Sequence, residues 1–133
     1  MICLDSWIFL EYYSFGPKRE KCEKLIFDAR KKIISTIALM ETIYKATRKL
    51  GKIRTKEIIR NIIGSTSITL VNVDKDIAEE AANLRLKYYK TGIRDISYSD
   101  CIHLATAILS KCKKFYSGDP DFNGIMEIPI EVV

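Results

Sequence analysis

Acidic side chains follow two short apolar segments of the sequence, directly after each segment ends. Asp5 follows ICL, and Asp119 and Asp121 follow KFYS. Where carboxylates converge they repel one another, and a hard divalent cation such as Mg²⁺ or Mn²⁺ relieves that repulsion. Such a cation keeps bound water and lowers its pKa, which prepares the water for hydrolytic attack. These residues are therefore candidate metal ligands, although the letters GDPD are also typical of an ordinary turn.

Two further acids lie near the beginnings of expected helices. Glu41 lies in a helix that follows the apolar segment KIIST, and its ordinary partner would be Lys45, one turn later. Asp100 stands three residues after Ser97, which is the spacing of a helix capping box. Each acid thus has a purely structural explanation. An Asp on a first helical turn nevertheless points toward the helix N-terminus, the end that would border a ligand crevice.

The apolar pattern alternates between short β-like runs and longer helical ones along the whole chain. Strands are expected at 2–4, 32–36, 68–73, 114–117 and, as an edge strand, 128–133. Helices are expected at 6–15, 18–30, 37–50, 55–63, 74–90 and 97–111. This alternation predicts a single α/β domain, 1–133, with a central, mainly parallel, twisted sheet flanked by helices. Parallel strands bring their carboxyl ends to one edge, so Asp5 and Asp119 are expected at the same crevice.

The composition bounds the class of protein. The 133 residues are 47% hydrophobic, which is enough to bury a core without covalent or metal staples. The cysteines show no C-x-x-C pairing and His103 is the only histidine, so neither a structural zinc site nor a redox motif is indicated. The thiols are expected to be reduced and buried. The chain has no signal-peptide pattern and no apolar run of about 18 residues, so a cytoplasmic protein without a membrane span is expected.

Basic residues outnumber acidic ones by 22 to 17, which gives a net charge of +5. They cluster at 18–21, 30–32 and 111–114, and six bases stand against one acid between Arg48 and Arg60. Clusters of this kind suit the phosphate backbone of a nucleic acid. Lysines and arginines also simply solvate helix faces, so charge alone leaves both interpretations open.

Four motifs, taken in order, resemble one known family. They are LDS at the end of the first strand, ME in the helix after KIIST, SYSDCIHLATA at a helix start, and YSGDPDF at the end of a later strand. Together they resemble the PIN-domain family of metal-dependent ribonucleases, and in particular its small single-domain toxins of the VapC type. The resemblance covers nearly all of the chain and is strongest over 96–122. It implies a three-layer PIN-like fold.

The resemblance also implies a role for each acid. The residues that correspond to the family's catalytic, metal-binding carboxylates are Asp5, Glu41, Asp100 and Asp119. Asp121 corresponds to an additional metal-binding acid, and Phe122 to a packing aromatic. Ser6 and Ser117 correspond to auxiliary hydroxyls, of which Ser117 would orient the last acid. Trp7 departs from the small polar residue that the family often has at that position.

The function that the resemblance implies is hydrolysis of RNA phosphodiester bonds by an endonuclease that depends on Mg²⁺ or Mn²⁺. It further implies an RNA substrate, a small antitoxin protein as partner, and a homodimer. Converging carboxylates agree with this chemistry, because an anionic pocket holds an anionic substrate only when metal ions and flanking bases offset the repulsion.

Other classes of protein remain open on the residues alone. A catalytically weak nucleic-acid-binding or scaffold protein would have the same fold. A phosphate-receiver domain needs paired acids near the first strand, and a phosphatase-like domain needs D-x-D there, whereas Asp5 is followed by Ser and Trp. His103 lies one turn after Asp100 and is interpreted as a packed histidine rather than a catalytic one. Tyr88, Tyr89 and Tyr98 either pack or stack on bases.

Overall fold

Five strands form one central sheet in the computed structural model, which describes residues 1–133. The strands are β1 (Ile2–Leu4), β2 (Lys32–Ser35), β3 (Ile68–Val71), β4 (Lys114–Ser117) and β5 (Ile130–Val132). Their order across the sheet is β3-β2-β1-β4-β5, and every neighbouring pair is parallel. The predicted α/β class is confirmed, and the sheet is wholly parallel.

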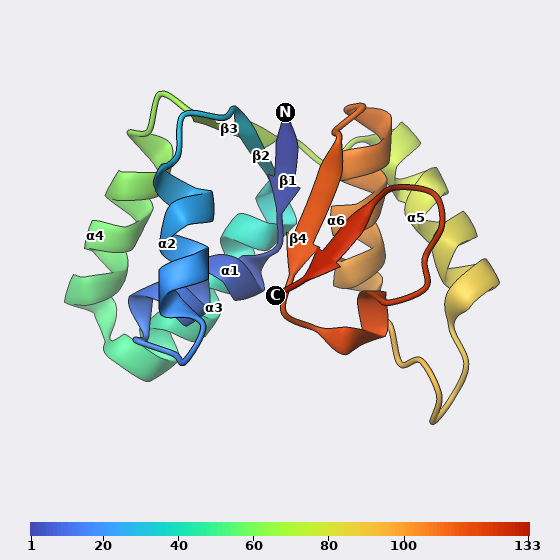
Figure 1. Cartoon of the computed structure of the whole chain (residues 1–133), viewed down its shortest axis with the longest axis horizontal. Helices are drawn as coiled ribbons and strands as arrows, with labels where there is room; N and C mark the ends of the chain where they lie inside the picture. Colours follow the sequence, from blue (N-terminus) through green and yellow to red (C-terminus); the bar gives the residue numbers. More distant parts are fainter.

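Helices cover both faces of this sheet. They are α1 (Ser6–Tyr13), α2 (Arg19–Phe27), α3 (Thr36–Leu50), α4 (Lys52–Ile63), α5 (Lys75–Tyr88) and α6 (Tyr98–Leu109), with a 3-10 turn η1 (Pro120–Phe122). Figure 1 shows α1 to α4 on one side of the sheet and α5 and α6 on the other. Side chains alternate along each strand, so Cys3 and Phe115 pack toward α5 and α6, whereas Leu4 and Tyr116 pack toward α1 and α2. Two cores and three layers result, as expected for a PIN-like fold.

Several elements differ from the expected ranges at their ends, and local side-chain bonds explain two of the differences. The helix expected at 18–30 ends at Phe27, because Asp28 adopts an extended backbone and its carboxylate binds the backbone and guanidinium of Arg30. The helix expected from residue 37 begins one residue earlier. Its N-cap is Ser35, whose hydroxyl accepts the N–H of Ala38 at 2.9 Å.

The cysteines are buried and unpaired: Cys3, Cys22, Cys101 and Cys112. Reduced, packed thiols were expected from their apolar neighbours, and the structure agrees. None of the helices combines the length and the apolar character that crossing a membrane would require.

Candidate active site

The carboxyl ends of β1 and β4 lie side by side. The candidate site is built at this edge of the sheet, hereafter the crevice. From β1 the chain moves to β2 on one side, and from β3 it returns to β4 on the other side of β1. This reversal is the point at which parallel sheets bind ligands. The backbone N–H of Asp5 donates to the carbonyl of Tyr116 at 3.0 Å, which fixes Asp5 against β4.

Asp5 is buried at this edge, with an exposed fraction of only 4%. The hydroxyl of Ser117 donates to its Oδ2 at 2.6 Å, and Ser6 lies 3.5 Å from its Oδ1. Although Asp5 stands at the N-cap of α1, its side chain makes no capping hydrogen bond. The carboxylate is therefore held by neighbouring hydroxyls, and both residues expected to be auxiliary, Ser6 and Ser117, contact it.

Glu41 reaches the same place from α3. Its Oε1 accepts a hydrogen bond from Ser6 Oγ at 3.2 Å and lies 2.5 Å from Nε2 of His103. No ion pair joins Glu41 to Lys45 within 4 Å. The exposed helix pair considered from the sequence is thus not what Glu41 forms. Its side chain is 18% exposed and points into the crevice beside Asp5.

His103 is the residue that the sequence did not assign to this site. Its side chain is 1% exposed, and its Nε2 also lies 3.7 Å from Oδ1 of Asp5. Nδ1 lies 3.0 Å from the hydroxyl of Ser35, which already accepts the N–H of Ala38. Ser35 Oγ therefore has its hydroxyl hydrogen free to donate to Nδ1. A neutral ring then carries its own hydrogen on Nε2 and donates it to Glu41. The spacing of three residues from Asp100 was the only sequence signal for its position.

The electrostatics of the group fit a hard cation. Ligand atoms of Asp5, Glu41 and His103 all lie within 4.8 Å of one another. Burial raises the pKa of Asp5, and the neighbouring Glu41 carboxylate adds to the rise. Burial acts in the same direction on the pKa of Glu41 and is the largest single influence on it. The hydrogen bond and charge of His103, the charge of Lys45 and the hydrogen bond from Ser6 together outweigh burial, so the net shift is downward. A buried carboxylate that faces a partly buried one is a donor set that a divalent metal ion stabilises.

Asp100 borders the group from the first turn of α6. Its carboxylate accepts the N–H of Ser97 at 3.1 Å while Ser97 Oγ accepts the N–H of Asp100 at 3.1 Å. The capping box expected from the sequence is therefore present. Burial raises the pKa of Asp100 to about 6, and repulsion from the Asp5 carboxylate contributes to this. Asp100 thus caps α6, and the negative charge of Asp5 also raises its pKa.

Asp119 and Asp121 lie beyond β4 and outside the 4.8 Å group. The carboxylate of Asp119 accepts the N–H of Asp121 at 2.9 Å and caps η1, so the turn interpretation describes its present contacts. Ser117 connects this turn to the crevice, because its Oγ accepts the N–H of Asp119 at 3.0 Å and donates to Asp5. Burial and the nearby Asp119 carboxylate raise the pKa of Asp121.

Trp7 packs directly over the start of the same turn. A Cβ added to Gly118 would lie 2.1 Å from the indole ring, so only glycine fits beneath it. Where the resemblance implied a small polar residue, the indole of Trp7 thus packs against the backbone that leads to Asp119.

Solved structures similar to this fold come from several bacteria. VapC20 of Mycobacterium tuberculosis, described as a sarcin–ricin loop cleaving toxin, superposes with a TM-score of 0.79 at 19% identity, over 97% of this chain and 99% of that one. DNA-bound VapBC from Salmonella typhimurium gives 0.75 at 21% identity, over 98% and 96%. A toxin–antitoxin complex from Klebsiella pneumoniae gives 0.72 at 23% identity, over 96% and 95%. At such low sequence identities, these structural similarities establish a common fold only.

The family assignment rests on the sequence profile. A search of curated proteins gave no significant match. The profile of the PIN domain, in contrast, matches residues 2–127, which is nearly the whole chain. The chain belongs to the PIN domain family.

Proposed function

We propose that this protein is a ribonuclease that depends on Mg²⁺ or Mn²⁺ and cleaves RNA phosphodiester bonds. The observation that carries the proposal is the convergence of Asp5 and Glu41, from two separate elements, at the switch point of a PIN-domain sheet. Asp100 borders them closely enough for its pKa to respond to Asp5. Oxygen ligands of this kind favour hard divalent ions over zinc.

The residues proposed to hold the cation are Asp5, Glu41, Asp100 and Asp119, with Asp121 in support. When bound, the cation would neutralise the carboxylates and provide an activated water for attack on phosphorus. Ser117 orients Asp5 through its 2.6 Å hydrogen bond, and Ser6 bridges toward Glu41. His103 acts as a positioning residue, because its ring holds the Glu41 carboxylate in the crevice.

The charge of the surface supports an RNA substrate. The net charge is +5, and the end of α3 together with α4 carries six bases between Arg48 and Arg60. Only Arg54 among them forms an ion pair, with Glu57. Bases without acidic partners attract a polyanion, and they offset the repulsion that the carboxylates would otherwise exert on it.

We also propose that the protein is the toxin of a toxin–antitoxin pair and that it forms a homodimer. The support for an antitoxin is that the similar structures include toxin–antitoxin complexes. The support for self-association is the exposed apolar face of α3, where Met40 is 54% and Tyr44 58% exposed. Co-expression with the product of a short neighbouring reading frame tests the first, because an antitoxin would relieve growth inhibition. Analytical ultracentrifugation tests the second.

The deciding experiment is cleavage of a panel of structured RNAs by the purified chain. We expect cleavage with Mg²⁺ or Mn²⁺ and none with EDTA. Asp5→Asn should be slower by about 100-fold or more, because it removes a charge from the metal-binding group. Glu79→Gln is the matched control, since it also removes a carboxylate but on the exposed face of α5, where Glu79 pairs with Lys75. Cleavage in EDTA would contradict metal dependence, and RNA that is bound but left intact would favour the scaffold alternative.

A further inference from the structure

We infer that Tyr98, braced by Arg85, forms a subsite that stacks on an unpaired base of the RNA next to the cleaved bond. This inference rests on the proposed ribonuclease function and adds to it a feature of the substrate: a single-stranded nucleotide on one side of the site. It follows from an exposed aromatic stack, an unpaired guanidinium and a hollow that lie together between α5 and α6.

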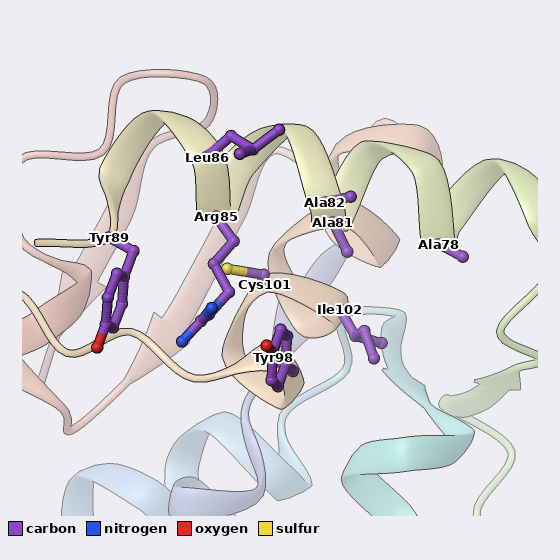
Figure 2. A pocket seen from close by; sticks show the side chains of 9 residues that line it. All are labelled: Ala78, Ala81, Ala82, Arg85, Leu86, Tyr89, Tyr98, Cys101 and Ile102. Carbon is purple, nitrogen blue, oxygen red and sulfur yellow. The ribbon is translucent and has the colours of Figure 1, made fainter.

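The stack consists of one arginine between two tyrosines. The guanidinium carbon of Arg85 lies 4.0 Å from the centre of the Tyr98 ring and 4.1 Å from that of Tyr89. Figure 2 shows the guanidinium between the two rings, with Tyr98 at the start of α6. The Nε of Arg85 donates to the carbonyl of Ile96 at 3.3 Å, which fixes the plane of the group. A ring held in this way is rigid before any ligand binds.

Tyr98 contributes little to the core of the protein. Its exposed fraction is 72%, and its hydroxyl makes no hydrogen bond to the rest of the chain. An aromatic side chain that stays this exposed offers most of its apolar surface to a partner. Every nucleobase presents a flat π-face, so a fixed aromatic ring accepts bases with little sequence preference.

The charge of Arg85 is available to an anion. It forms no ion pair with any acidic residue. A comparable contact between the end of α1 and the start of α2 differs in this respect: Arg19 lies 4.8 Å from the Phe15 ring but pairs with Glu23 at 3.3 Å. An aromatic ring beside an uncompensated guanidinium combines base stacking with attraction for the phosphate backbone, and this combination fits RNA better than an apolar peptide.

The space beside the stack is large enough for a base. The hollow between α5 and α6 measures about 540 Å³, within the range of small-ligand sites. Ala78, Ala81 and Ala82 line it from α5, and their short side chains leave the room that a ring requires.

The position of Tyr98 relative to Asp100 decides which nucleotide it would bind. The two residues stand first and third in α6, and residues two apart project to different sides of a helix. Asp100 faces the crevice, whereas Tyr98 faces α5 and the hollow. A base on Tyr98 therefore belongs to a nucleotide that flanks the cleaved bond, not to the one whose phosphate is attacked.

The test compares a short single-stranded oligoribonucleotide with an abasic oligomer of the same length, by fluorescence anisotropy in the absence of cleavage. The full-length protein carries Asp119→Asn so that it binds without turnover. We expect the base-containing oligomer to bind about tenfold more tightly than the abasic one. Adding Tyr98→Ala should abolish this difference, and Tyr98→Phe should retain it. Phe15→Ala, which removes an equally exposed ring at 69%, is the matched control and should have no effect.

Cleavage kinetics separate this inference from the proposed function. In otherwise wild-type protein, Tyr98→Ala should raise KM about tenfold and leave kcat nearly unchanged, because the ring does not touch the reacting atoms.

If the wild type cleaves RNA and Tyr98→Ala has the same KM and the same base preference, the subsite is refuted while the proposed ribonuclease function stands. If the wild type cleaves no RNA, the proposed function fails, and the anisotropy comparison still decides the subsite. A change in oligomeric state of Tyr98→Ala without loss of base preference would assign the hollow to a second copy and overturn the inference.

Discussion

Nε2 of His103 lies 2.5 Å from Oε1 of Glu41, and the same ring is anchored through Nδ1 to Ser35, the N-cap of the helix that carries Glu41. The imidazole thus fixes both the start of α3 and the carboxylate that α3 presents to the crevice. If Glu41 holds the metal ion, as proposed, a buried ring that fixes its carboxylate would tune metal binding without contacting the ion.

His103→Leu should therefore weaken Mn²⁺ binding by about tenfold or more, with a similar loss in cleavage rate. His103→Gln should retain part of both, because its amide N–H donates to Glu41 from a similar position. Calorimetric titration with Mn²⁺ gives the affinity. Thr106→Val is the matched control, since Thr106 is equally buried on α6 but bonds only within its own helix, to the carbonyl of Ile102. Wild-type Mn²⁺ affinity in His103→Leu would rule out the positioning role.

The two acids after β4 are expected to differ in their effect on cleavage. Asp119→Asn keeps an oxygen that accepts the N–H of Asp121, so the turn should persist. Loss of its charge should nevertheless slow cleavage by about 100-fold, because Asp119 is proposed to hold the metal ion together with Asp5. Ser117 connects the two, since its Oγ accepts the N–H of Asp119 and donates to Asp5. Asp121→Asn should be milder. Single-turnover cleavage at saturating Mg²⁺ measures both, and similar rates for wild type and Asp119→Asn would reduce the stretch to a turn.

Asp100 gives a prediction about metal and stability together. Asp100→Asn keeps the oxygen that accepts the N–H of Ser97 but removes a charge that Asp5 repels. In EDTA at neutral pH the variant should unfold at the same temperature as the wild type or higher. Mg²⁺ at about 100 times its dissociation constant should stabilise the wild type by about 2.7 kcal/mol and the variant by clearly less. Thermal unfolding with and without Mg²⁺ measures this, and equal shifts would mean that Asp100 is only a cap.

The sequence was sufficient for those features that depend on local pattern. The three central strands are short buried runs, and the two outer strands are short, partly exposed, β-branched runs. Parallel connections leave few arrangements for such runs, so the sheet and the shared edge of Asp5 and Asp119 followed. The capping box of Ser97 and Asp100 is a local motif and was predicted correctly.

Features that depend on packing between distant elements could not be predicted. The Ser35–His103 contact joins residues 68 positions apart and exists only because α3 packs near α6. Glu41 turned toward that ring instead of toward Lys45, since a partner inside the crevice outweighs a weak exposed pair. Helix ends also moved by a few residues where a side chain, such as that of Asp28, bound the backbone.

The contact of Trp7 with Gly118 predicts coupling between the two positions. Gly118→Ala places a methyl group 2.1 Å from the indole and should destabilise the protein by about 1–3 kcal/mol. In a Trp7→Leu background the same change should cost much less, because the ring that it strikes is gone. Urea unfolding of the two single variants and the double variant gives the coupling energy. Additive effects would show that crowding against Trp7 is not the reason for the glycine.

The last prediction concerns acid stability at the opposite end of the sheet. Lys32 has a fully buried side chain whose Nζ lies 3.2 Å from Oδ1 of Asp28, and Arg30 binds the same carboxylate at 2.6 Å. Burial tends to raise the pKa of Asp28, but the hydrogen bonds from Arg30 and Lys32 outweigh it and lower the pKa to about 2. A pKa depressed on folding stabilises the protein above the unfolded value of about 3.9, and this contribution is lost as the pH falls through the folded value of about 2.

Asp28→Asn should therefore reduce the free energy of unfolding by about 1–2 kcal/mol at pH 7, and the difference from wild type should shrink to a small fraction of this as the pH approaches 2. Urea unfolding across this range measures it, with Glu79→Gln as the exposed control. A difference as large at pH 2 as at pH 7 would contradict the electrostatic origin.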